Sequence, residues 1–169
     1  MIKTNRTRPS WDQFFMFSAL WTATRSSCLH LQTGAVIVKD KRIIASGYNG
    51  APPGIKSSLE LNSCRKDEHG VDFKDKGKSV CRGLHAEMNA IDQIAREDLK
   101  ETSIYSLYFP CSSCAKEIVG NGITEVIYSR IYAEPDSLTK ELFEEGGIQL
   151  RKLELDTTKY FDIIKNIIK

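Results

Sequence analysis

Residues 104–130 read IYSLYFPCSSCAKEIVGNGITEVIYSR, and they are the most informative part of the sequence about the fold. Its two ends, Ile104–Phe109 and Glu125–Tyr128, are rich in β-branched and aromatic residues, which favour strands. Between them Cys111–Val119 is expected to be a helix, ended by Gly120-Asn121-Gly122. A strand, a helix and a strand in this order predict two parallel strands joined by a right-handed crossover.

The segments on either side extend this pattern to one mixed sheet. Two short β-rich runs, joined across Asp40-Lys41, predict an antiparallel hairpin. We expect a three-layer α/β/α sandwich around a five-stranded mixed sheet, with residues 1–169 forming a single domain. The further elements expected along the chain are Trp11–Cys28, Ala35–Lys39, Arg42–Ser46, Leu84–Arg96, Ser137–Glu145, Ile148–Leu153 and Thr157–Ile167.

The expected first helix is strongly apolar. Ser10 is a plausible N-cap residue, and Asp12 lies in the first turn. Because the aromatic side chains recur at helical spacing, we expect them to face the core. The apolar stripe consists of Phe14, Phe17, Trp21, Thr24 and Cys28, and it is widened by Phe15 and Met16.

The composition is that of an ordinary globular protein and limits the classes of partner. A formal net charge of +2 over 169 residues is too small to favour a nucleic-acid partner. The basic residues Lys3, Arg6 and Arg8 are expected in a poorly ordered tail of about ten residues. The apolar stretch 14–21 is too short to span a membrane. Five cysteines, an odd number, indicate a cytoplasmic protein whose thiols bind metal or pack in the core.

Two short motifs carry the chemistry, His85-Ala86-Glu87 and Pro110-Cys111-Ser112-Ser113-Cys114, and each begins a predicted helix. Cys111 and Cys114 are three residues apart, so both sulfurs lie on one side of the first turn, where the helix dipole favours thiolates. With a nitrogen from His85 they leave the fourth tetrahedral position of a zinc ion to water, as in catalytic sites. Alone, C-x-x-C would also fit a redox pair or half of a structural zinc site.

Together and in this order, the motifs form the H-x-E…P-C-x-x-C signature of zinc-dependent nucleobase deaminases. Zinc lowers the pKa of a bound water to about 7. Glu87 lies two residues after His85 and can reach this water without binding the metal. We expect Glu87 to take the water proton, deliver it to ring N3 as C4 is attacked, and then help to protonate the departing ammonia.

Four segments give a more specific resemblance, over roughly residues 11 to 155. The chain resembles the deoxycytidylate deaminase family within the cytidine deaminase superfamily. The Gly-Tyr-Asn-Gly segment and the Asn after H-A-E-x are typical of that family and usually differ in the related transfer RNA adenosine deaminases. The four segments are Thr33–Val38, Gly47–Pro52, His85–Ile91 and Pro110–Lys116.

This resemblance implies hydrolysis of dCMP to dUMP and ammonia, which feeds thymidylate synthesis. It implies that the amide of Asn49 contacts the sugar, because an amide can donate to and accept from a hydroxyl. It also implies that the backbone N–H of Ala86 binds the base carbonyl. An Asn49 that merely occupies a left-handed turn beside Gly50 is the alternative. Arg25, near the end of the first helix, is the candidate for binding the 5′-phosphate, and a surface arginine is the alternative.

The resemblance also implies a second, structural zinc that joins the end of the first helix to an irregular insert, residues 51–80. Such a metal would stabilise an insert with little apolar content of its own. Alternatively, Cys28 is a small core residue and the other cysteines are free thiols. The positions that match this site are Cys28, Cys64, Cys81 and, as fourth ligand, His69, with His30 as the runner-up.

Members of this family are often homo-hexamers, activated by dCTP and inhibited by dTTP, and Mg²⁺ is expected only together with a nucleotide effector. Related activities remain open, namely deamination of another cytosine nucleotide or nucleoside, or of tRNA adenosine. The weak net charge argues against tRNA but does not separate dCMP from cytidine. From another class, the rival is a non-enzymatic zinc-binding protein of the competence type. Glu87 argues against that rival, since a structural site needs no proton shuttle.

Overall fold

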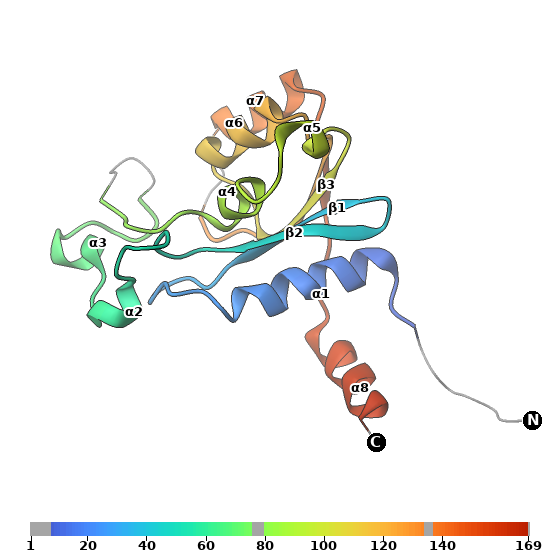
Figure 1. Ribbon diagram of the computed structural model, residues 1–169, viewed down its shortest axis with the longest axis horizontal. Coiled ribbons are helices and arrows are strands. Elements are labelled where there is room, and N and C mark those ends of the chain that lie inside the picture. The colour runs from blue at the N-terminus through green and yellow to red at the C-terminus, as the bar shows by residue number, and fades with distance from the viewer. Residues whose placement is uncertain (1–7, 76–79, 134–136, 169) are drawn as a thin grey trace, which may run out of the picture.

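The computed structural model describes residues 8–75, 80–133 and 137–168 and places helices on both faces of a sheet (Figure 1). The expected basic tail falls mainly outside these ranges, as do Lys3 and Arg6. Arg8 is exposed, and its guanidinium carbon lies 5.9 Å from the centre of the Trp11 ring.

Within the described ranges, five strands form one mixed sheet in the order β2-β1-β3-β4-β5. β1 (Gly34–Lys39) pairs antiparallel with both β2 (Arg42–Tyr48) and β3 (Ser103–Tyr108). β4 (Glu125–Arg130) lies parallel to β3, and β5 (Gln149–Lys152) lies parallel to β4. The predicted hairpin, crossover and mixed sheet are therefore confirmed.

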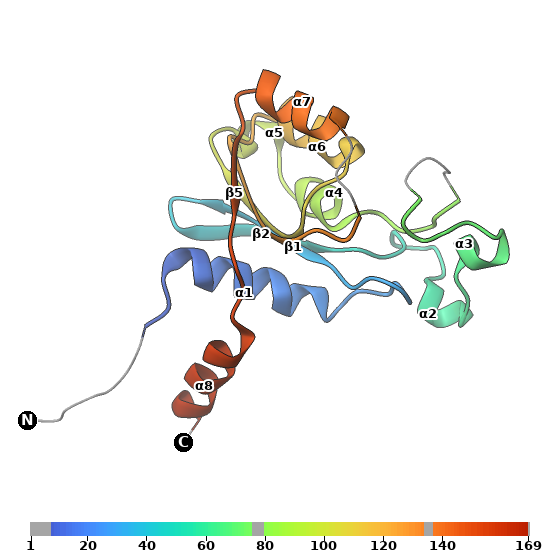
Figure 2. The same cartoon turned by 180° about the vertical axis from the view of Figure 1, so that it is seen from behind.

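Helices cover both faces of this sheet (Figures 1 and 2). One face carries α1, with α8 beside it, and the other carries α4, α6 and α7, with the short α5 nearby. This is the predicted three-layer arrangement. In the described parts of the chain the helices are α1 (Trp11–Ala23), α2 (Ser58–Leu61), α3 (Arg65–Glu68), α4 (Ala86–Ile91), α5 (Arg96–Leu99), α6 (Ser112–Gly120), α7 (Ser137–Glu145) and α8 (Thr157–Ile167).

One apolar core lies on each face, and the alternation along β3 divides its side chains between them. Ile104 joins the core beneath α4, α6 and α7. Tyr105 and Leu107 join the core beneath α1.

Both α1 and α4 approach the sheet so closely that only glycine fits at the contact. A Cβ atom at Gly34 in β1 would lie 2.3 Å from the carbonyl oxygen of Ala19 in α1. A Cβ atom at Gly47 in β2 would lie 2.3 Å from the carbonyl oxygen of Ala86 in α4. Backbone therefore rests on backbone at both contacts, and the contact at Gly47 fixes the helix that carries the H-x-E motif.

The prediction that the aromatic stripe of α1 faces the core is wrong. Phe14 is 45% exposed and Trp21 is 68% exposed. The reason is the close contact at Gly34, because only the face with small alanines can reach the sheet there. The buried residues of α1 are Phe15, Met16, Ala19 and Ala23.

Two helix boundaries also differ from the prediction. α1 ends at Ala23 and not at Cys28, because the next residues turn toward the loop after β2, where the Ser26 hydroxyl donates to Asn49. The helix predicted over 84–96 is shorter, because α4 ends at Ile91 and a separate short helix, α5, begins only at Arg96. The predicted Ser10 N-cap is confirmed as part of a capping box.

A membrane-spanning helix needs both length and an apolar surface, and none of the helices in the described ranges has this combination.

Polar contacts hold the irregular insert that contains α2 and α3. Lys66 Nζ donates to the carbonyl oxygens of Phe73 (3.0 Å) and Asp75 (2.6 Å). His30, which follows α1 in the chain, lies 2.8 Å from the Asp67 carboxylate and stacks on Phe73. The insert is thereby tied to the segment between α1 and β1.

Candidate active site

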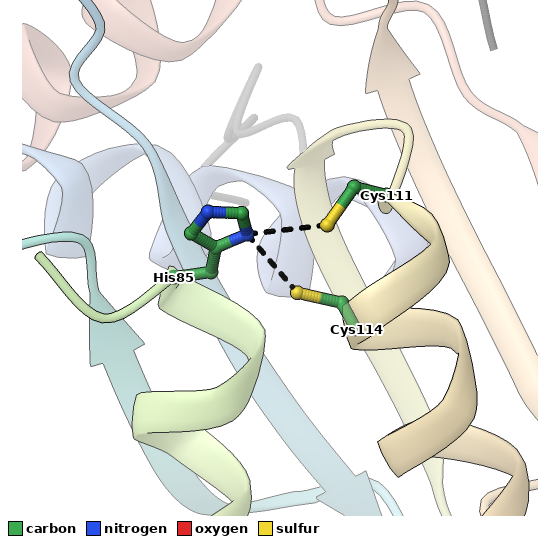
Figure 3. A group of neighbouring side chains, drawn as sticks. All are labelled: His85, Cys111 and Cys114. Carbon is green, nitrogen blue, oxygen red and sulfur yellow. Dashed lines mark hydrogen bonds between the residues drawn. The ribbon is translucent and has the colours of Figure 1, made fainter. Parts of the chain in front are cut away.

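Three side chains able to bind a metal meet where two helices begin. His85 is the N-cap residue of α4, Cys111 is the N-cap residue of α6, and Cys114 lies in the first turns of α6. The Nδ1 atom of His85 lies 3.3 Å from the Sγ atoms of both cysteines (Figure 3). Around a tetrahedral zinc ion with bonds of about 2.3 Å to sulfur and about 2.0 Å to nitrogen, such atoms lie about 3.5 Å apart. The three predicted ligands of the catalytic zinc are thus brought together in a geometry that fits zinc.

Local sequence explains why both helices begin at this place. β3 ends at Tyr108, and Pro110 cannot donate to a strand partner, so the chain leaves the sheet there and enters α6. A short bridge between Gly50 and Leu84 brings the segment before α4 beside the loop after β2. Gly47 then allows the backbone of α4 to pack directly against the sheet.

The electrostatics of this cluster favour a bound cation. Hydrogen bonds from Cys114 and His85 lower the pKa of Cys111 to about 3, although burial opposes the shift. The pKa of Cys114 is raised well above its usual value, because its thiol donates a hydrogen bond to the Cys111 sulfur and is buried. Interaction with Cys111 raises the pKa of His85. A buried thiolate is costly without a compensating charge, and Zn²⁺ prefers sulfur and imidazole nitrogen as ligands.

Glu87 lies beside the cluster without being part of it. Its side chain is buried, with 5% of the residue exposed. Oε2 lies 3.5 Å from the Sγ atom of Cys114, and Oε1 accepts a hydrogen bond of 2.9 Å from the Ser106 hydroxyl. A carboxylate held against a group of metal-binding side chains is suited to move protons to and from a substrate there.

A pocket of about 140 Å³ opens onto this cluster. His85, Glu87 and Cys111 line its inner part. Its cationic side chains are Lys66 and Arg82, neither of which sequence reasoning identified. The sequence did contain an indication that Arg82 lies near the site, because this residue precedes His85, a predicted zinc ligand, by three positions. The pocket is also lined by Thr33, Asn49, Tyr108 and Tyr132.

The predicted substrate-binding residues differ in how the structure places them. Asn49 lines the pocket, but Oδ1 accepts hydrogen bonds from Ser26 Oγ (2.6 Å) and Thr33 N (2.9 Å), and Nδ2 donates to the Leu31 carbonyl oxygen (2.7 Å). Only one hydrogen of its amide is left for a ligand. Ala86 is the first residue of α4, where backbone N–H groups have no partner within the helix.

Arg25 is exposed and does not line the pocket. The reason is the early end of α1, because the chain turns after Ala23 and Arg25 follows the turn. Of the cations that do line the pocket, Lys66 is bound to two carbonyl oxygens of the insert. No other residue in the described ranges forms a hydrogen bond or an ion pair with Arg82.

The residues predicted for the second zinc are only partly brought together. Cys28, Cys64 and Cys81 all line the pocket. The ligand atoms of Cys64 cluster within 4.8 Å with those of His30 and Asp67. His69 is not in this cluster, and its Nδ1 atom lies 2.9 Å from the Arg65 carbonyl oxygen at the end of α3. His30, the runner-up, is thus the better placed histidine.

Comparison with known proteins gives a consistent picture. Residues 9–130 match the model of the cytidine and deoxycytidylate deaminase zinc-binding region. The chain is 38% identical to deoxycytidylate deaminase of Schizosaccharomyces pombe, over 90% of this chain but only 47% of that protein. It is 39% identical to deoxycytidylate deaminase of Mus musculus, over 91% of this chain and 84% of that protein.

Two further similarities bear on function. ComE operon protein 2 of Bacillus subtilis is 37% identical, over 88% of this chain and 74% of that protein. The crystal structure of dCMP deaminase from the cyanophage S-TIM5 in complex with dCMP and dUMP is similar, with a TM-score of 0.70 and 25% identity. That likeness covers 88% of this chain and 100% of the phage chain.

Proposed function

Because this chain belongs to the cytidine and deoxycytidylate deaminase family, we propose that it converts dCMP and water to dUMP and ammonia. The observation that carries the proposal is the buried Glu87 beside the cluster of His85, Cys111 and Cys114. The mouse and fission yeast relatives and the phage structure with bound dCMP and dUMP support this substrate. The chain spans about half of the fission yeast protein, so the proposal concerns the chain itself and not that longer relative.

His85, Cys111 and Cys114 are the residues that hold the catalytic zinc in this proposal. Zinc bound there supplies a Lewis acid that lowers the pKa of water to about 7. Glu87 accepts a proton from the attacking water and delivers it to N3 of cytosine. The same carboxylate then takes a second proton, from the hydroxyl now bound to C4, and gives it to the amine, which departs as ammonia while the C4 carbonyl of dUMP forms. The N–H of Ala86, at the start of α4, donates to the base carbonyl.

The sugar is bound at the side of the pocket formed by the loop after β2. Asn49 retains one amide hydrogen that can donate to a sugar hydroxyl. Thr33 supports the same assignment, because its hydroxyl is buried in the pocket wall and has no hydrogen-bond partner within the described ranges. Buried hydroxyls normally have a partner, and a ligand would supply one here.

Arg82, and not Arg25, is the residue that binds the 5′-phosphate in this proposal. Arg82 lines the pocket and lies close in sequence to His85, whereas Arg25 lies outside the lining. A charge-assisted hydrogen bond contributes about 1.5–3 kcal/mol, or about 10- to 150-fold in kcat/KM.

The test is a panel of cytidine, deoxycytidine, CMP, dCMP and dCTP with the zinc-loaded protein, followed by loss of absorbance. We expect dCMP to be the best substrate. Arg82→Ala should lower kcat/KM for dCMP by about 10-fold or more and leave deoxycytidine turnover nearly unchanged. Arg25→Ala is the matched control and should alter neither. A wild-type protein that is indifferent to the phosphate would replace the nucleotide assignment with a nucleoside one.

A second, structural zinc belongs to the same proposal, with Cys64 and His30 as its central ligands. Cys28 and Cys81 line the same pocket and are the further candidate ligands. The site would join the segment after α1 to the insert, where His30 already contacts Asp67. A closed set of sulfur and nitrogen ligands is typical of structural zinc.

Assembly and regulation complete the proposal. We expect a cytoplasmic homo-oligomer, a hexamer by resemblance, that responds to dCTP with Mg²⁺ and to dTTP. The exposed aromatic residues of α1, which include Trp11, Phe14 and Trp21, support self-association, since soluble monomers rarely expose large apolar patches. The mass in solution, measured by light scattering with and without dCTP and Mg²⁺, tests this part.

The second candidate is the one that the sequence left open, a zinc-binding protein of the competence type without enzymatic activity. The two candidates differ in whether Glu87 is used. Zinc-dependent release of ammonia from dCMP by the purified protein supports the deaminase. No release from any compound of the panel, with zinc fully bound, would support the non-enzymatic candidate.

A further inference from the structure

Ser106 is a polar residue in an apolar place. It lies in β3 between Tyr105 and Leu107, which face α1, so its own side chain points to the opposite face, beneath α4 and α6. Ile104, two residues earlier, packs in the core on that side. Ser106 is 0% exposed. A buried hydroxyl lowers stability unless it is hydrogen-bonded, so the partner of Ser106 explains why the residue is tolerated.

That partner is the catalytic carboxylate. The Ser106 hydroxyl donates to Oε1 of Glu87 over 2.9 Å. The other carboxylate oxygen, Oε2, lies 3.5 Å from the Sγ atom of Cys114. One oxygen is thus held against the sheet, and the other is directed at the metal-binding cluster.

The orientation of this carboxylate depends on such a contact. The last side-chain torsion of glutamate has a broad energy profile, so hydrogen bonds and not rotamer preference set the plane of the carboxylate. Ser106 does not line the pocket, whereas Glu87 does. A substrate in the pocket therefore meets Glu87, and Ser106 lies behind it.

We propose that Ser106 is a positioning residue for Glu87, which holds the carboxylate plane in the orientation needed for proton transfer. This inference rests on the proposed deaminase function. Ser106 acts on the reaction through Glu87 alone, so its loss lowers kcat and leaves KM for dCMP nearly unchanged. A merely structural serine would instead change stability without a selective effect on kcat.

The first arm of the test is kinetic. Ser106→Ala should lower kcat for dCMP by about 10- to 100-fold, with KM within about twofold and zinc content unchanged. Ser106→Thr keeps the hydroxyl and should restore most of the loss. In a Glu87→Gln background, Ser106→Ala should have little further effect, because the carboxylate that it positions is gone. Full and additive losses in that background would overturn the proposal, as would an unchanged kcat in Ser106→Ala.

The matched control is Thr102→Val, which removes another fully buried hydroxyl. The Thr102 hydroxyl donates to the Leu99 carbonyl oxygen over 2.7 Å and forms no hydrogen bond with Glu87, whose partners are Ser106 and Cys114. This variant should lose stability and keep kcat. If kcat falls equally in Thr102→Val and Ser106→Ala, the loss comes from a general weakening of the core, and the proposal is overturned.

The second arm does not depend on activity. In protein labelled with ¹³C at the glutamate side-chain carboxyl, the Glu87 resonance is the one missing in Glu87→Gln. We expect this resonance to shift in Ser106→Ala and to stay in place in Thr102→Val, and an unmoved resonance in Ser106→Ala would overturn the proposal. If the wild-type protein deaminates none of the panel, the proposed function fails, and this resonance still decides whether Ser106 orients Glu87.

Discussion

Substitution of Gly47 by alanine tests whether the sheet sets the position of the active site. The added Cβ atom would lie 2.3 Å from the carbonyl oxygen of Ala86 and 2.4 Å from the backbone nitrogen of Ala90. Ordinary contact begins at 3.4 Å, and both neighbours are helix backbone that cannot rotate away. To restore ordinary contact, α4 must retreat from β2 by about 1 Å, because a close-packed interior offers no free volume for the methyl group.

This movement should affect catalysis more than the fold. His85 is the N-cap residue of α4 and Glu87 lies in its first turn, so both shift relative to Cys111 and Cys114 of α6. A misplacement of about 1 Å can lower the rate about 100-fold, whereas overpacking typically costs about 1–3 kcal/mol of stability. For Gly47→Ala we therefore expect a loss of about 100-fold in kcat/KM for dCMP, together with a lower melting temperature and weaker zinc binding.

Two other glycines provide controls for this experiment. Gly34→Ala creates an equally close contact, 2.3 Å from the carbonyl oxygen of Ala19, but against α1 on the opposite face. Gly120→Ala meets no atom within 4 Å and should be neutral. Steady-state kinetics, zinc content and thermal melting of the three variants give the comparison. If Gly34→Ala and Gly47→Ala lose the same stability and also the same activity, the contact between α4 and β2 does not position the site.

Catalysis, metal content and pH dependence give three further predictions. Glu87→Gln should keep its zinc and its fold but lose about 10²- to 10⁴-fold in turnover, and near-normal turnover in a zinc-loaded sample would remove Glu87 from the mechanism. Metal analysis should find about two zinc ions per chain, about one in His30→Ala and about two in His69→Ala, whereas one per chain in the wild type would leave only the catalytic site. Because a hydrogen bond from Arg151 lowers the pKa of Asp12, Asp12→Asn should lower the melting temperature at neutral pH. The depressed pKa means that this difference is fully present above the usual pKa of 3.8 and shrinks as the pH falls below it, so a difference that grows in acid contradicts the reasoning.

The amino-acid sequence alone was enough to predict the order of the elements and the two motifs of the proposed site. Helix and strand signals are local, so α7 and α8 have the predicted bounds, and the hairpin and crossover follow from short connections. The proposed metal ligands were also predictable, because Cys111 and Cys114 lie together at the start of one helix and His85 is the N-cap residue of another. Spacing along one chain segment is enough to indicate such chemistry.

Which residues meet across the fold depends on tertiary packing. Apolar residues occur around most of α1, so periodicity could not show that Ala19 faces the sheet and Trp21 faces outward; the close contact with Gly34 decides this. The pocket is lined by Arg82 and not by Arg25, because the chain turns at the end of α1. The hydrogen bond from Ser106 to Glu87 joins a strand to a helix 19 residues away, and no local pattern reports such a pair. Packing between distant segments, and not propensity, selects these contacts.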